Sequence, residues 1–138
     1  MLTVKTSVGP SDIQGMGLFT QENIPAGATV WVYDPRFDIS FDCQEVEMML
    51  ELQRELITRF AYISKETGKY IFCIDNSRFI NHLSSGRNNL DVVRIMGEPE
   101  WRGIANRDIE VGEEITVDYQ KLWVTQGLEK PKSDKISN

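Results

Sequence analysis

The sequence RFINH at residues 78–82 is answered by GEEITVDY at residues 112–119, and these two stretches decide the fold. His82 is the only histidine of the chain, and it follows an asparagine within an apolar run. The second stretch ends in the phenol of Tyr119. Such separated segments are less typical of core packing than of the two halves of one site. We therefore expect them to lie together in the folded chain.

Length and charge bound the class of protein. The chain has 138 residues, 41% of them hydrophobic, and a formal net charge of −6. This length suits one domain with a real core and is too short for two. We find no apolar run near the ~18 residues of a membrane span and no signal sequence, so we expect a cytoplasmic protein, or a nuclear one in a eukaryotic cell. The negative charge argues against direct binding of nucleic acid. It is compatible with a basic partner, or with simple solvation of the surface.

Several common site chemistries have no matching pattern. Cys43 and Cys73 form no CxxC pair, and one histidine excludes a histidine-rich metal site, so we expect no metal and two reduced thiols. No P-loop, HExxH or GxSxG motif is present. The triplet Gly15-Met16-Gly17 is a weak signal by itself, because glycines one residue apart are common in turns.

Periodicity predicts short strands and one helix. Strands are expected near residues 28–33, 69–74, 91–96, 101–105 and 114–117. The helix is expected over about 43–61, with Asp42 as N-cap and Glu45 in capping-box spacing. Its apolar face has one polar member, Gln53, and otherwise consists of Val46, Met49, Leu50, Leu56, Ile57 and Phe60. Without alternating βαβ order, we do not expect a doubly wound nucleotide-binding sheet.

A weak internal echo relates residues 17–30 to residues 103–115. Each contains an isoleucine, a glycine three residues later and a β-branched residue three further on, which we interpret as strand, tight turn, strand. Two copies are too few for a repeat protein. We expect one domain over residues 1–126 and a disordered tail at 127–138, where Lys, Ser, Asp, Pro and Asn dominate.

Taken in order, the motifs resemble those of the SET-domain protein lysine methyltransferases, from about residue 4 to Trp123. They are Gly15-Met16-Gly17, RFINH, residues 105–109 and GEEITVDY, and short stand-alone viral and bacterial members look most similar. The chain departs from the family at Leu83, where serine is usual, and in a following loop without proline. The resemblance implies a mainly β, β-clip-like fold of several small sheets, in which residues 81–82 and the Tyr119 segment cross in a knot-like arrangement.

The resemblance also implies a cofactor and a site. Tyr119 would be the catalytic residue, and S-adenosylmethionine would be the methyl donor. The cofactor-binding residues would be Gly15, Met16, Gly17, Arg78, Asn81, His82, Tyr119 and Trp123. The residues lining a lysine channel would be Tyr62, Tyr70, Phe72 and Trp123. Aromatic walls suit such a channel because they accept both a methylene stem and a cationic head.

These features predict methyl transfer to a lysine of a basic protein, with histones and other chromatin or nucleoid proteins as the leading substrates. A homodimer is also expected from the resemblance. A non-catalytic module that binds a peptide or the cofactor stays an alternative, which Leu83 favours and Tyr119 opposes; a small β protein without ligand is the third. The acids Asp108, Glu110, Glu113, Glu114 and Asp118 either attract a lysine-rich peptide or form a solvated hairpin.

Overall fold

The computed structural model describes residues 1–122, within which ten short strands and three α-helices form. The predicted mainly β class is confirmed. The strands are β1 Thr6–Pro10, β2 Met16–Thr20, β3 Thr29–Trp31, β4 Asp38–Phe41, β5 Tyr62–Ile63, β6 Tyr70–Cys73, β7 Asn81–His82, β8 Leu90–Val93, β9 Arg102–Ala105 and β10 Thr116–Val117. The helices are α1 Cys43–Glu47, α2 Glu51–Phe60 and α3 Tyr119–Leu122, with a 3₁₀ helix at Asn76–Phe79. Trp123, the predicted domain end at 126 and the predicted tail at 127–138 lie outside the described residues.

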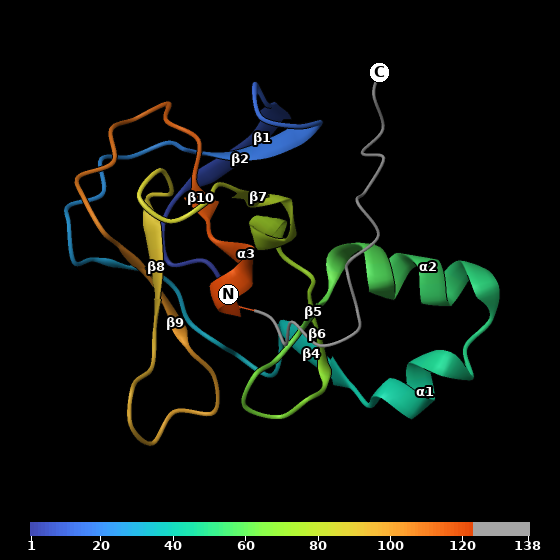
Figure 1. Ribbon diagram of the computed structural model, residues 1–138. Coiled ribbons are helices and arrows are strands. Elements are labelled where there is room, and N and C mark those ends of the chain that lie inside the picture. Colours follow the sequence, from blue (N-terminus) through green and yellow to red (C-terminus); the bar gives the residue numbers. More distant parts are fainter. Residues whose placement is uncertain (123–138) are drawn as a thin grey trace.

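The strands are divided among three small sheets (Figure 1). β1 pairs with β2, and the strand orders of the other two sheets are β3-β9-β8-β10-β7 and β4-β6-β5. Figure 1 shows α1 and α2 beside the β4-β6-β5 sheet, away from β8 and β9. Within residues 1–122 no helix is long and apolar enough to cross a membrane.

The two motifs lie side by side, as expected. β10 pairs in parallel with β7, with Thr116 opposite Asn81 and Val117 opposite His82. On its other side β10 pairs with β8. The C-terminal strand therefore runs between two strands that are consecutive in sequence, which is the close crossing that the resemblance implied.

The internal echo is explained by pairing between its two copies. The N–H of Ile24 donates to the carbonyl of Ile109 at 2.8 Å, and the N–H of Ile109 donates to the carbonyl of Ile24 at 2.8 Å. Gly27 and Gly112, the turn glycines, have φ of 84° and 89°, the left-handed region that the turn interpretation required. The matched apolar residues of both copies meet in the largest core cluster, with Leu18, Ile24, Val30, Leu90, Ala105, Ile109, Ile115 and Val117.

The prediction of one helix over 43–61 is wrong, because α1 ends at Glu47 and α2 begins at Glu51. Asp42 holds the N-cap position without a side-chain hydrogen bond, and its carboxylate instead lies 3.5 Å from the Lys69 amine. Gln53 marks the second start, since its side chain accepts a hydrogen bond from the Leu50 N–H at 3.1 Å. The predicted apolar face is only partly buried: Val46 and Ile57 are in the core, whereas Leu50 is 73% and Leu56 49% exposed.

Candidate functional site

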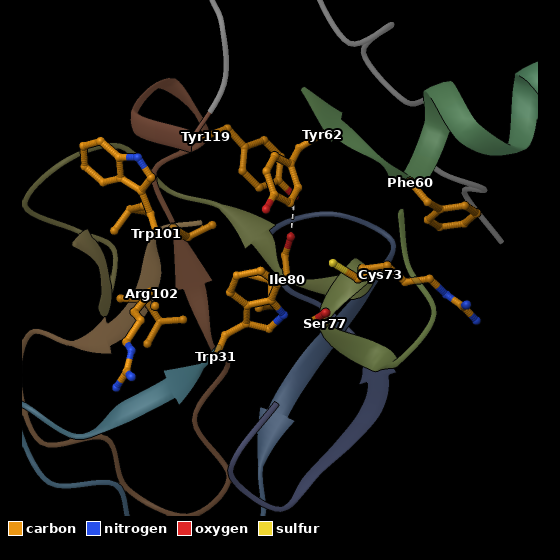
Figure 2. A pocket seen from close by; sticks show the side chains of 14 residues that line it. Trp31, Phe60, Tyr62, Cys73, Ser77, Ile80, Trp101, Arg102 and Tyr119 are labelled. Carbon is orange, nitrogen blue, oxygen red and sulfur yellow. Dashed lines mark hydrogen bonds between the residues drawn. The ribbon is translucent and has the colours of Figure 1, made fainter. Parts of the chain in front are cut away.

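Tyr119 begins α3, and Asp118 alone separates it from β10. Its hydroxyl donates to the carbonyl of Ile80, the residue before β7 (Figure 2). Its N–H donates to Nδ1 of His82 at 3.0 Å, and the two rings pack with centroids 5.2 Å apart. Burial, with a smaller contribution from Glu114, raises the pKa of the Tyr119 phenol well above its ordinary value. The site therefore holds a neutral, oriented hydroxyl.

His82 is held by the same segment, and its role is structural in this arrangement. Its Nδ1 accepts the Tyr119 N–H and lies 3.8 Å from Asp118. Asp118 in turn accepts hydrogen bonds from the hydroxyl of Ser85 at 2.6 Å and the N–H of Gln120 at 3.0 Å. Burial disfavours ionisation of Asp118, but these hydrogen bonds and His82 outweigh it and hold the pKa below the usual range.

Asn81 connects the crossing to the glycine loop near the N-terminus. Its side chain is fully buried. The amide nitrogen lies within hydrogen-bond distance of the carbonyl of Gln14 (3.2 Å), the carbonyl of Met16 (3.1 Å) and a carboxylate oxygen of Glu114 (2.7 Å). The Ser11 hydroxyl oxygen, at 3.1 Å, is a fourth oxygen around this nitrogen, and oxygen acceptors of this kind also suit the ammonium group of a ligand.

Glu114 explains why residue 17 is glycine. The hydroxyl of Ser11 donates to the Glu114 carboxylate at 2.8 Å, and Asn81 donates to it as well. A Cβ placed on Gly17 would lie 2.1 Å from the nearer oxygen of that carboxylate. Gly15 turns the loop in the left-handed region, with φ of 48°. The glycine loop, Asn81 and Glu114 therefore form one packed cluster.

An apolar cavity of about 90 Å³ lies on the other side of Tyr119. Figure 2 shows Tyr119, Tyr62 and Trp31 around it, with Trp101 on a further wall. The indole N–H of Trp31 and Nε of Arg78 are buried without a hydrogen-bond partner within the described residues. An aromatic cavity with spare donors can take an alkyl chain and orient a polar group on it.

The predicted site residues fall into two groups. Gly15, Met16, Gly17, Asn81 and His82 gather around the crossing. The residues of the predicted site that line the cavity are Tyr62, Arg78 and Tyr119. Trp123 lies outside the described residues.

Tyr70 and Phe72 do not line the cavity, contrary to the predicted channel. Alternate residues of a strand face opposite sides, and on β6 these two pack against the helices, whereas Cys73 faces the cavity.

Sequence reasoning missed Trp31, Phe60 and Trp101 as cavity residues. Trp31 lies in a predicted strand and Trp101 opens another, but only the pairing of β3 with β9 brings these segments together. These residues could have been predicted from the expected chemistry, because a lysine channel has aromatic walls and the chain has few tryptophans to form them.

Four of the five acids predicted to attract a basic peptide form contacts inside the protein. Asp108 accepts the N–H of Ala26, Glu113 pairs with Arg107 at 3.1 Å, and Glu114 and Asp118 have the partners described above. Of the five acids proposed to attract a basic peptide, only Glu110 has no side-chain contact of this kind within residues 1–122. Over the same residues no cluster of three or more metal-ligating side chains occurs.

The departure at Leu83 leaves the crossing intact. The Leu83 N–H donates to the carbonyl of Val117 at 3.2 Å, a backbone bond that serine would also make. The following loop without proline anchors β10 through buried Asn89, whose side chain bonds Thr116 N–H at 2.8 Å and the Glu114 carbonyl at 2.8 Å.

Comparison with known families agrees with this geometry. A family model for the SET domain matches residues 15–120, which is more than half of the chain. The matched range begins in the glycine loop, contains both halves of the crossing and ends just after Tyr119.

Proposed function

The chain belongs to the SET-domain family, whose members are generally protein lysine methyltransferases, and we propose that it transfers a methyl group from S-adenosylmethionine to the ε-amine of a lysine in a basic protein. The observation that carries the proposal is the Tyr119 hydroxyl, fixed by the Ile80 carbonyl at the wall of an aromatic cavity. Asn81, which bonds to the glycine loop, belongs to the same crossing and is not among the residues that line the cavity.

The cavity favours the reactive form of the acceptor. A free lysine has a pKa of about 10.4, so a neutral amine at pH 7 costs about 4.6 kcal/mol. Transfer of the amine into a cavity walled by Trp31, Tyr62 and Trp101 disfavours the ammonium and lowers this pKa. The same walls hold the methylene stem and exclude water, so that the nucleophile is not hydrated.

Tyr119 acts as an orienting group and not as a strong base. The Tyr119 hydroxyl donates its hydrogen bond to the Ile80 carbonyl. The lone pairs of the phenol oxygen therefore stay available to accept a hydrogen bond from an amine N–H or to contact a polarised methyl group. Its raised pKa keeps the hydroxyl neutral at physiological pH. The fixed O–H dipole of Tyr119 thus contributes to methyl transfer by positioning the amine along one axis.

The residues of the Asn81 cluster fit the proposed cofactor. The carbonyls of Gln14 and Met16 and the Glu114 carboxylate surround the Asn81 amide nitrogen, and oxygens of this kind are also the acceptors that an amino-acid ammonium group needs. We propose that the glycine loop, Asn81 and the His82 main chain hold S-adenosylmethionine, which supplies a methyl group activated on a sulfonium sulfur. The chain's part is to bind, orient and dehydrate the two reactants.

A radiolabelled transfer assay on a mixture of histones tests the proposal. Tyr119→Phe should lower the rate on the order of 100-fold, the range for loss of one preorganised polar contact to reacting atoms. Tyr33→Phe is the matched control, because within residues 1–122 the hydrogen-bond contact of that hydroxyl is with exposed Ser40, at 3.4 Å. Calorimetry with S-adenosylmethionine separates binding from turnover.

A non-catalytic module is the second candidate, and the complete burial of Asn81 among protein acceptors favours it. Cofactor binding without methyl incorporation into any basic protein would establish this candidate and reject the enzyme. Incorporation that Tyr119→Phe abolishes and Tyr33→Phe leaves within about twofold would reject the module.

A further inference from the structure

α2 carries an exposed apolar row that ends at the cavity. Leu52 and Leu56 are 79% and 49% exposed, and Phe60, one turn further, lines the cavity. Residues four apart lie on one face of a helix, so these three form a continuous row along α2. Leu50 and Met48, 73% and 88% exposed, extend the apolar surface across the turn between α1 and α2. Such a cluster exceeds the scattered exposed apolar side chains normal for a protein surface.

Carboxylates run beside this row. Glu51 and Glu55 lie one position before Leu52 and Leu56, about 100° around the helix, and so form the neighbouring row. Glu45 and Glu47 continue the negative charge on α1. Within residues 1–122 none of these four carboxylates forms an ion pair.

Within residues 1–122 the two arginines of α2, Arg54 and Arg59, form no ion pair with these acids, and Arg59 lies over the Phe60 ring. The guanidinium of Arg54 donates to the main-chain carbonyl of Glu47 at 3.2 Å. By contrast, Asp108, Glu113, Glu114 and Asp118 already have partners inside the protein. Within residues 1–122, four carboxylates that form no ion pair therefore lie on the two helices that carry the apolar row.

We propose that the α1–α2 surface, defined by Met48, Leu50, Leu52 and Leu56 with Glu45, Glu47, Glu51 and Glu55, docks a basic amphipathic helix of the methyl-acceptor protein. The apolar stripe of such a helix would pack on the row, and its lysines and arginines would face the carboxylates. The inference rests on the proposed function, and it names a second point of contact for that substrate outside the lysine cavity.

Two observations favour this occupant. The row leads through Phe60 into the cavity, so a helix docked there would leave its flanking segment close to Tyr119. A second copy of the chain is disfavoured, because a symmetric contact would bring the same carboxylates against each other. Opposite charge across the contact also speeds encounter and selects basic proteins from neutral ones.

A binding measurement tests the surface without turnover. The probe is a fluorescent Leu/Lys peptide of about 18 residues, roughly five helical turns, with leucines at helical i, i+3, i+4, i+7 spacing. Its control has the same composition in an order without a stripe. Anisotropy is measured with the Tyr119→Phe protein, and we expect the striped peptide to bind at least about tenfold more tightly.

Exposed substitutions identify the surface. Leu52→Gln with Leu56→Gln should weaken binding about tenfold, as expected when two contacts at the centre of an interface are removed. Glu51→Lys with Glu55→Lys should weaken it similarly and flatten its salt dependence. The matched controls are Met96→Gln, at a side chain 98% exposed in the β8–β9 loop, and Glu110→Lys, both expected within about twofold.

The outcomes separate docking from catalysis. Equal affinity for both peptides, or unchanged affinity in the Leu52/Leu56 variant, overturns the docking surface. So does a dimer of the protein that this variant dissociates, since the occupant is then a second copy.

Methyl transfer to N-acetyl-lysine amide tests the proposed function by itself. In otherwise wild-type protein, the Leu52/Leu56 variant should keep this rate and raise KM for histones about tenfold. Docking as expected with no transfer to any acceptor would instead reject the proposed function.

Discussion

Gly17→Ala tests whether the glycine loop exists to accommodate Glu114. The added Cβ would lie 2.1 Å from a carboxylate oxygen of Glu114 and 3.1 Å from the Cβ of Ser11. The φ of Gly17 is not in the left-handed region, so backbone strain does not contribute to the cost. The carboxylate, at the end of a flexible side chain, has to move.

The magnitude follows from the hydrogen bonds that the carboxylate leaves. It accepts one from Ser11 at 2.8 Å and one from Asn81 at 2.7 Å. Hydrogen bonds to charged groups contribute about 1.5–3 kcal/mol each, and partial rearrangement recovers some of this. We expect a loss of about 2–4 kcal/mol in the free energy of unfolding, or roughly 10 °C in Tm.

Calorimetry of four proteins measures this. Glu114→Ala removes the clash, so Gly17→Ala in that background should cost less than ~1 kcal/mol, and the double-mutant cycle should show a coupling of about 2 kcal/mol. Gly9 is the cross-strand partner of Gly17, and a Cβ there meets nothing nearer than Phe19 at 3.8 Å. Gly9→Ala should stay within ~1 kcal/mol of wild type or stabilise slightly. Additive costs, or a Gly17 variant as stable as the Gly9 variant, would refute the reasoning.

Three further predictions concern acidity and packing. Folding lowers the pKa of Asp118, so the ionised carboxylate stabilises the fold above the unfolded pKa near 3.8, and this stabilisation is lost as the pH falls through the folded pKa. Asp118→Asn should therefore lower the free energy of unfolding at pH 7 by about 1 kcal/mol. Urea titrations should show that the difference between the two proteins shrinks below about pH 4. Ile57→Ala should cost about 2–4 kcal/mol and Leu56→Ala less than ~1, because Ile57 is 5% and Leu56 49% exposed, as the same titrations would show. The raised pKa of Tyr119 keeps its phenol neutral, so kcat measured up to about pH 10, the ordinary tyrosine value, should rise or level and not fall.

The order of motifs along the chain predicted the crossing but not the walls of the cavity. Asn81, His82 and Tyr119 come together because short strands of matching motifs pair. The sequence also predicts strand β6 and places Tyr70 and Phe72 in the lysine channel, but both lie on the face of β6 that packs against the helices. β6 is apolar on both faces, because one face packs against the helices and the opposite face packs against Trp31. Periodicity alone does not state which face meets the site.

The helix prediction was wrong for a related reason. A continuous apolar face over 43–61 presupposes a core along its whole length, and the β4-β6-β5 sheet is too small to supply one. The helix is interrupted after α1, so that Val46 and Ile57 are buried while Leu52 and Leu56 stay exposed. The apolar residues of the 43–61 segment thus form two surfaces, one that packs in the core and one that we assign to a partner.

The residues of the proposed site also hold the crossing together, which limits what a loss of activity means. β7 and β10 pair over only two residues each. Beyond that short ladder, the crossing depends on Asn81 with Glu114, on Tyr119 with the Ile80 carbonyl, and on the Tyr119 N–H with His82. A substitution in any of these can therefore reduce methyl transfer by loosening the crossing. Only a variant such as Tyr119→Phe, which keeps the ring and its backbone bond to His82, separates chemistry from register, and then only if Tm falls by no more than the loss of about one hydrogen bond.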